Sequence, residues 1–260
     1  MMPPVKVTPS RIFALHLGII LLLGLAFGLV AMADQLGHPT LKGFSREFRL
    51  QEEANIPSFF SALALFVTAL ASMAVSHALP RGDRDRLGWK VMAGLFIFMA
   101  FDEAAQIHEL IDLPHALMKY DRYLHYFSVF PYLAVAAVLA AILFPFWLRL
   151  SRDLRFMFAL AGILYVLSAV GMEVFENELV VAGASEHSLR MALNYALEEL
   201  GEMLAVALFL RTILTRLAQI GGGVLLPVEI EAEAATETRS GPVHIGPVPQ
   251  PASAKARLER

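Results

Sequence analysis

The chain contains no cysteine, and only 17% of its 260 residues are charged. The absence of cysteine excludes disulfide bonds, thiolate metal sites and cysteine nucleophiles. The net charge of -3 is too small to indicate nucleic-acid binding. The phosphate-binding loop GxxxxGKS/T, the zinc-protease motif His-Glu-x-x-His and the hydrolase motif Gly-x-Ser-x-Gly are also missing. The sequence therefore gives no support for the enzyme classes that carry these signatures.

Long apolar stretches dominate the chain instead. Hydrophobic residues make up 57% of the sequence, and the mean hydropathy is +0.59. A helix needs about 20 residues to cross a hydrocarbon core of about 30 Å, and helices satisfy their own backbone polar groups in lipid. We therefore expect an all-α fold, a polytopic membrane helical bundle. Six transmembrane helices are predicted, at residues 12–33, 56–79, 87–110, 126–148, 154–175 and 191–217.

Both ends of the chain are expected to lie outside this domain of residues 12–217. Residues 1–11 form a short N-terminal segment. Residues 218–260 combine three consecutive glycines, an acidic Ala/Glu stretch and scattered prolines, which is typical of a disordered tail. The sequence at 31–33 resembles a signal-peptidase site, but the apolar core before it, about 20 residues, exceeds the usual 7 to 15. We expect the first helix to be retained, although the sequence leaves cleavage open.

Lysine and arginine residues near the helix ends predict the orientation. One side of the bundle would carry eleven of them, namely Lys6, Arg11, Arg81, Arg84, Arg86, Lys90, Arg149, Arg152, Arg155, Arg211 and Arg216. The other side would carry six, namely Lys42, Arg46, Arg49, Lys119, Arg122 and Arg190. Because the more basic side of a membrane protein normally faces the cytoplasm, both termini are predicted to be cytoplasmic.

Acidic side chains occur within the apolar segments, where a charge costs about 2.5–3.5 kcal/mol. With the predicted orientation all of them share the extracytoplasmic half, and at 100° per residue each helix presents them as a stripe. We expect three such stripes to face one site. Eight carboxylates lie within or at the edge of these segments, namely Asp102, Glu103, Glu109, Glu173, Glu176, Glu198, Glu199 and Glu202. Glu103 and His108 lie off the stripe of Asp102 and Glu109, on opposite sides of it. Since like charges repel strongly in a low dielectric, either several are protonated or bound cations neutralise them.

A metal site is the leading interpretation of these acids. Oxygen-rich ligands with few histidines favour a divalent ion such as Mg²⁺, Mn²⁺ or Ca²⁺, with non-haem iron also considered. The predicted metal ligands are Asp102, Glu109, Glu173, Glu176, Glu198 and Glu202. The predicted catalytic residues are Glu103 and Glu199 as candidate general bases and His108 as a ligand or proton shuttle. The corresponding function is a metal-dependent enzyme acting on a lipid-like substrate.

Two alternatives use the same residues. In the first, the acids pass protons or cations along in a proton- or cation-coupled transporter or channel. In the second, protonated carboxyl groups form hydrogen bonds between the helices of a structural or assembly protein. The sequence does not decide whether the chain is an enzyme, nor its substrate or oligomeric state. Glu53 and Asn55, just before Pro57, are interpreted first as a helix start and second as part of a lid or ligand site.

Two motifs resemble those of a group of uncharacterised bacterial multi-pass membrane proteins. The first is Glu-x-Asn-x-Pro, formed by Glu53, Asn55 and Pro57. The second is Asp-Glu-Ala-Ala-x-x-His-Glu at residues 102–109. The resemblance covers about two of the predicted helices and implies no activity. We expect a multi-pass protein of the bacterial inner membrane, with the lipid bilayer as its partner.

Overall fold

The computed structural model describes residues 8–38, 40, 43–107, 129–185 and 188–221. These residues form helices and no strand, which confirms the all-α prediction. The longer helices are α1 (Pro9–Gln35), α2 (Ile56–Ala78), α3 (Asp85–Ala105), α5 (Val129–Arg149), α6 (Arg152–Val166), α7 (Met172–Val181) and α8 (Leu189–Gly221). A short 3-10 helix, η2 (Arg46–Phe48), precedes α2, and a π-helix, η5 (Leu167–Gly171), joins α6 to α7.

Four helical segments in the described residues are long and apolar enough to cross a membrane. They are Pro9–Gln35, Ile56–Ala78, Arg152–Val181 and Leu189–Gly221. The third of these combines α6, η5 and α7 into one continuous helical segment. Many large apolar side chains on α1 and α5 are exposed, for example Leu21, Leu25, Val135 and Ile142, as expected for helices that face lipid.

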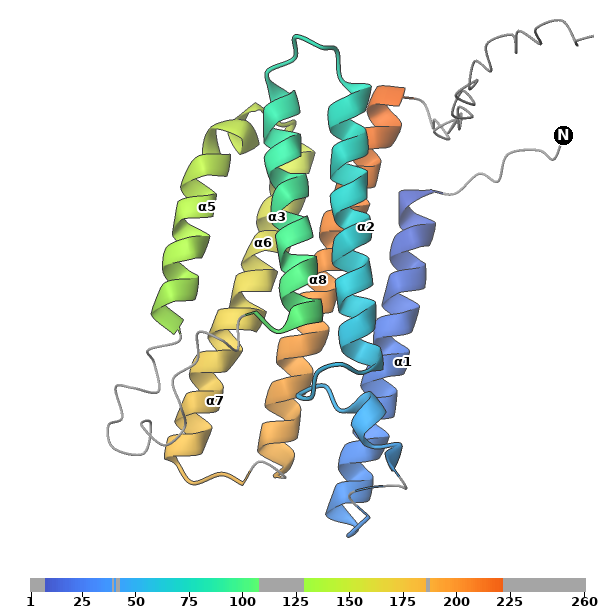
Figure 1. Cartoon of the computed structure of the whole chain (residues 1–260), viewed down its shortest axis with the longest axis vertical. Helices are drawn as coiled ribbons and strands as arrows, with labels where there is room; N and C mark the ends of the chain where they lie inside the picture. The colour runs from blue at the N-terminus through green and yellow to red at the C-terminus, as the bar shows by residue number, and fades with distance from the viewer. Residues whose placement is uncertain (1–7, 39, 41–42, 108–128, 186–187, 222–260) are drawn as a thin grey trace, which may run out of the picture. The chain divides into compact units, whose positions relative to one another are not determined.

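Helix α8 is the centre of the bundle (Figure 1). It packs against α1, α2, α6 and α7, whereas α2 and α3 form an antiparallel pair with the most extensive contact of all. Helix α5 touches α3 and α6 only lightly. Any side chain that projects from α8 toward α2 and α3 on one side, or toward α6 and α7 on the other, is therefore enclosed by protein.

The start of α2 follows from its local sequence. The Oδ1 atom of Asn55 accepts a hydrogen bond from the Ser58 backbone N–H at 3.1 Å, and the Asn55 N–H donates to the Ser58 hydroxyl at 3.0 Å. This reciprocal capping box starts α2, with Pro57 in the first turn, where no backbone donor is needed. The interpretation of these residues as a helix start is confirmed.

The end of α3 differs from the prediction. The helix stops at Ala105, five residues before the predicted end at residue 110, because Gln106 has a φ of 56° and takes the left-handed conformation. Its N–H closes the last turn on the Asp102 carbonyl. Hydropathy alone gave no signal for this break, and Asp102 and Glu103 consequently lie in the final turn of the helix.

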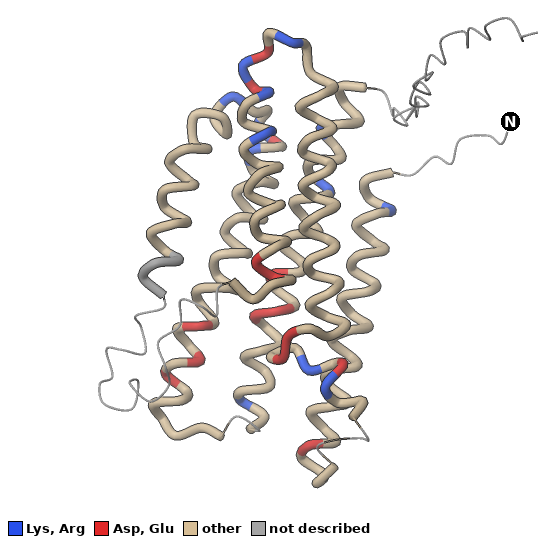
Figure 2. The backbone as a smooth tube through the Cα atoms, in the orientation of Figure 1, with Lys and Arg blue, Asp and Glu red and all other residues tan. Residues whose placement is uncertain are grey.

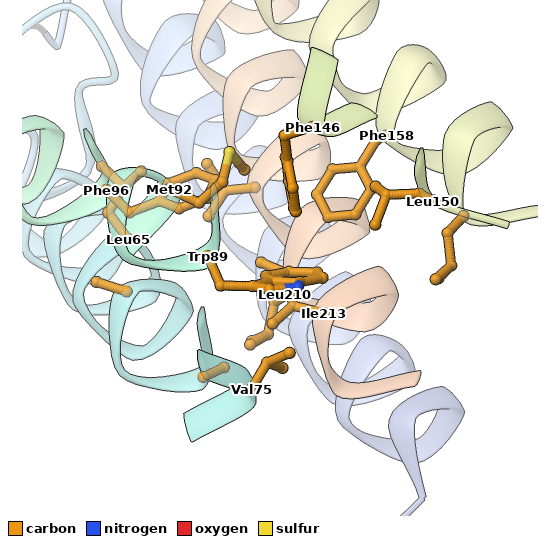
Figure 3. Packing of buried hydrophobic residues seen from close by; sticks show 14 of the residues in the cluster. Leu65, Val75, Trp89, Met92, Phe96, Phe146, Leu150, Phe158, Leu210 and Ile213 are labelled. Carbon is orange, nitrogen blue, oxygen red and sulfur yellow. The ribbon is translucent and has the colours of Figure 1, made fainter. Parts of the chain in front are cut away.

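Apolar and aromatic side chains fill the half of the bundle nearest the α2–α3 turn. Figure 3 shows Trp89, Phe146 and Phe158 within this packing. We call Trp89, Phe96, Phe146, Phe158 and Phe209 the aromatic cluster; they come from α3, α5, α6 and α8. The ring centroids of Trp89 and Phe146 are 5.3 Å apart in an edge-to-face arrangement. The Trp89 side chain is fully buried. This half of the bundle is apolar and closely packed.

Candidate functional site

Acidic residues gather in the other half of the bundle, along α8 and the segments around it (Figure 2). We call the following residues the acidic cluster: Glu53, Asp102, Glu103, Glu173, Glu176, Glu198, Glu199 and Glu202. Most basic residues lie at the opposite end of the bundle (Figure 2). On α3 and α8 alike, the aromatic cluster lies on the side of the acids nearest the α2–α3 turn.

Glu199 is the junction of the acidic cluster. Its carboxylate interacts electrostatically with Glu202 and Glu198 of its own helix and with two groups from other segments. Those two are Glu103, at the end of α3, and Glu53, which comes just before the start of α2. Glu199 is half-buried as a residue, and these groups surround its side chain. Carboxylates from three separate segments therefore lie within electrostatic range of Glu199.

Glu202 lies one turn deeper along α8. It receives a side-chain hydrogen bond from the Tyr165 hydroxyl of α6 and interacts electrostatically with Asp102. Tyr165 also interacts with Glu103 and Glu199. A phenol has a proton to donate and a lone pair to accept one, so Tyr165 extends the row of carboxyl groups by one more proton-carrying side chain.

The opposite flank of α8 faces α7. The Tyr195 hydroxyl donates to Oε1 of Glu176 at 3.2 Å, and Nδ2 of Asn194 donates to the Met172 backbone carbonyl at 3.3 Å. Glu198 interacts electrostatically with Glu176, Glu173 and Glu202. These contacts make α7 and α8 a second wall of the acidic cluster.

Two amide groups at this wall have a polar atom without a hydrogen bond among the described residues. Asn194 is only 1% exposed, and its buried Oδ1 atom accepts no hydrogen bond from the described residues. The Nδ2 atom of Asn177 on α7 is buried in the same way. Buried polar atoms are normally paired, so each needs an explanation.

The π-helix η5 lies between Tyr165 and the acids of α7. A π turn takes up one residue more than an α turn, and π turns occur frequently at functional sites. Ser168 within η5 is buried, and Gly201 of α8 lies directly against it: a Cβ atom on Gly201 would overlap the Ser168 side chain. The absence of a side chain at residue 201 allows the π turn to approach α8 between Glu198 and Glu202.

The segment before α2 is tied to the bundle by polar contacts. Asn55 is 5% exposed, and its Nδ2 group donates to the carbonyl oxygens of Arg49 at 2.7 Å and Glu52 at 2.6 Å. The Arg49 guanidinium reaches both carboxylate oxygens of Asp34 on α1, at 3.1 and 2.9 Å. These bonds fix the segment that carries Glu53 against the acids of α8.

Most of the predicted site residues are brought together. Asp102 and Glu103 both reach α8, and Glu173, Glu176, Glu198, Glu199 and Glu202 belong to the same cluster. His108 and Glu109 lie outside the described residues. Among the residues that the structure describes, no three His, Asp or Glu side chains are arranged so that they could hold a metal ion. The prediction of a metal site is therefore not supported by the described part of the chain.

Tyr165 and Ser168 were missed by sequence reasoning. In a regular α-helix at 100° per residue, Tyr165 and Glu173 would point about 80° apart. Because the π turn takes up one extra residue, the directions of Tyr165 and Glu173 around the helix axis correspond to a spacing of seven residues in a regular α-helix. The two side chains then point about 20° apart. The available signal was a tyrosine in the middle of an apolar segment, which commonly has a hydrogen-bond partner.

A family model described as a domain of unknown function, DUF8692, matches residues 14–217. The match covers more than half of the 260 residues, so the chain belongs to this family. This agrees with the predicted membership of an uncharacterised family. Comparison with curated proteins and with solved structures gives no match.

Proposed function

We propose that this DUF8692 protein is a multi-pass protein of the bacterial inner membrane whose acidic cluster takes up protons or cations from the extracytoplasmic side during coupled transport. In this proposal α3 and α5 also cross the bilayer, which gives six transmembrane helices with both termini in the cytoplasm. The excess of Lys and Arg at the end of the bundle opposite the acidic cluster supports that orientation (Figure 2).

One observation carries the transport proposal: protonatable groups follow one another from the start of α2 into the bundle. Glu53 interacts with Glu199, Glu199 with Glu202, and Glu202 accepts a hydrogen bond from Tyr165. We call these four residues the relay. Rows of ionisable groups inside a membrane protein are typical of proton and cation pathways. Groups placed only to tie helices together need no such continuity.

The aromatic cluster explains how such a pathway would be closed on its cytoplasmic side. Beyond Tyr165 and Glu202 the interior is filled by rings such as Phe158 and Phe209, whose centroids are 5.9 Å apart. Apolar constrictions block ions and water because no polar partner replaces the hydration shell. The relay is then a half-pathway from the extracytoplasmic side, and passage requires the aromatic cluster to rearrange.

Reconstitution tests the proposal. We expect liposomes that contain the purified protein and a trapped pH-sensitive dye to show proton flux driven by an imposed gradient. Glu199→Gln combined with Glu202→Gln should abolish the flux, because both relay positions lose their charge and their proton. The matched control is Glu47→Gln, which removes the charge of an exposed carboxylate outside the relay. Flux that survives the double substitution would refute the transport proposal.

A metal-dependent enzyme acting on a lipid-like substrate is the second proposal. It is favoured by Glu198, which interacts with both Glu173 and Glu176, two carboxylates one turn apart on α7. Glu103 and Glu199 would act as general bases, and a bound Mg²⁺, Mn²⁺, Ca²⁺ or iron ion would polarise the substrate. Elemental analysis of the purified protein, before and after addition of each ion, tests it: protein that binds none of them contradicts this function.

A further inference from the structure

Asn194 presents a buried acceptor that the rest of the site does not use. Its Nδ2 group must face α7, because the Met172 carbonyl at 3.3 Å can only accept a hydrogen bond. Its Oδ1 atom is thereby turned away from that carbonyl, and it is buried with no partner among the described residues. An unpaired oxygen in a residue that is 1% exposed is costly unless a donor or a cation occupies the space beside it.

Acidic side chains share the α7–α8 interface with Asn194. Glu198 lies one turn further along α8, on the same face of the helix, and Tyr195 bonds Glu176 across the α7–α8 interface. Among the described residues, the groups that act electrostatically on Glu198 include three carboxylates, Glu202, Glu173 and Glu176. A neutral oxygen acceptor among carboxylates is the environment that attracts a cation, whereas an anion or an apolar group would be repelled or leave the oxygen unpaired.

The oxygen atoms available as ligands favour a small, hard, monovalent cation. In many transporters backbone carbonyl oxygens at interrupted helices coordinate Na⁺. Amide and carboxylate oxygens are ligands that hard cations prefer. At the α7–α8 interface, an amide oxygen of Asn194 and the carboxylate of Glu198 lie on the face of α8 that meets α7, next to the π turn η5. The described residues hold no group of three carboxylates or histidines suited to a metal ion, and such a group is what a divalent ion usually requires.

We propose that the α7–α8 interface holds a sodium-ion subsite in which Asn194 Oδ1 is the neutral ligand and Glu176 and Glu198 supply negative charge. The inference rests on the proposed transport function and identifies the coupling ion. The relay of Glu53, Glu199, Glu202 and Tyr165 would then carry protons, and the subsite would make the same protein respond to sodium.

Binding of radioactive ²²Na⁺ to the full-length protein in detergent tests the subsite directly, with K⁺ and Mn²⁺ as competitors. We expect saturable binding that unlabelled Na⁺ displaces, and thermal stabilisation by Na⁺ that K⁺ does not give. Asn194→Leu removes the oxygen and should weaken binding by about tenfold or more, a loss of about 1.4 kcal/mol. Asn194→Asp keeps an oxygen ligand and should retain binding, which guards against a Leu variant that merely unfolds.

The outcomes separate the subsite from the proposed function. Sodium binding that is lost in Asn194→Leu and kept in Asn194→Asp supports the subsite. Proton flux through the reconstituted protein without any ²²Na⁺ binding overturns the subsite alone, and Asn194 Oδ1 then holds only a water molecule. Equal ²²Na⁺ binding in wild type and Asn194→Leu also overturns it. Absence of both flux and binding overturns the proposed transport function as well.

Discussion

Gly201 of α8 lies in direct contact with Ser168 of η5, so that even one added carbon atom at residue 201 would overlap the serine side chain. The contact lies between Glu198 and Glu202 on one helix and between Tyr165 and Glu173 on the other. Small residues at helix contacts let two backbones approach closely in membrane proteins. The spacing of α6–η5–α7 from α8, and with it the geometry of the acidic cluster, depends on this pair.

We expect Gly201→Ala to destabilise the protein by about 1–3 kcal/mol, because overpacking at a tight contact forces backbone shifts. Unfolding of the purified protein in mixed micelles measures the effect. Gly94→Ala is the matched control, since a Cβ there meets nothing within 4 Å. Combining Gly201→Ala with Ser168→Gly should restore most of the loss. If Gly201→Ala is as stable as Gly94→Ala, the close contact does not exist in the folded protein.

Both the oxygen and the nitrogen of the Asn55 side-chain amide should contribute to the stability of the protein. Asn55→Ala removes the N-cap of α2 and leaves the Arg49 and Glu52 carbonyls without their donor. Loss of the cap alone costs about 0.5–2 kcal/mol, and the total should exceed that range. Asn55→Asp keeps the cap oxygen but not the donor, and its loss of stability should lie between those of wild type and Asn55→Ala. An Asp variant as unstable as the Ala variant would show that capping contributes little.

The ion pair of Arg49 and Asp34 joins the segment before α2 to α1. Both side chains are 13% exposed, so removing one leaves a mostly buried charge. We expect Arg49→Met to cost about 2–4 kcal/mol and the Arg49→Met/Asp34→Leu double variant to cost less than the sum of the single changes.

Arg46→Ala is the control for this pair. Its side chain is 70% exposed and lies 3.7 Å from Glu52, so its loss should change stability by less than about 1 kcal/mol. Four variants are compared by thermal unfolding in one detergent: Arg49→Met, Asp34→Leu, the combination of these two, and Arg46→Ala. Additive effects of Arg49→Met and Asp34→Leu would contradict a direct interaction between the two side chains.

Because the sequence contains no cysteine, a single introduced cysteine can be labelled specifically and used to test the orientation. Single cysteines introduced at Gly82, in the α2–α3 turn, and at Gln51, before α2, are both at exposed positions. With the proposed topology, a membrane-impermeant maleimide added to spheroplasts should label Gln51→Cys and leave Gly82→Cys unlabelled until the membrane is broken. The reverse labelling pattern would mean that the protein has the opposite orientation in the membrane, with the acidic cluster on the cytoplasmic side.

Tyr165→Phe should reduce proton flux by about 10²-fold, because it removes the hydroxyl that bonds Glu202 at the deep end of the relay. Tyr195→Phe is the matched comparison: it also loses one hydroxyl bound to one carboxylate, Glu176, but lies off the relay. We expect it to keep most of the flux. Equal losses in the two variants would mean that protons do not pass through Tyr165.

Hydropathy and helical spacing were sufficient to predict the helices and most members of the acidic cluster. They worked because α8 is a regular helix, so Glu198 and Glu202, one turn apart, had to share a face. They failed where the backbone departs from regularity. Gln106 ends α3 in a left-handed conformation without a glycine, and η5 alters the phase between Tyr165 and Glu173; neither has a simple local sequence signal.

The π turn at Leu167–Gly171 has a consequence for comparing family members by sequence. Since such a turn absorbs a single extra residue, a relative that is one residue shorter between Val166 and Met172 would form an uninterrupted α-helix there. The counterparts of Tyr165 and Glu173 would still lie on one side of that helix. A one-residue gap at this point should therefore be accepted in an alignment, and the functional positions on either side of it aligned independently.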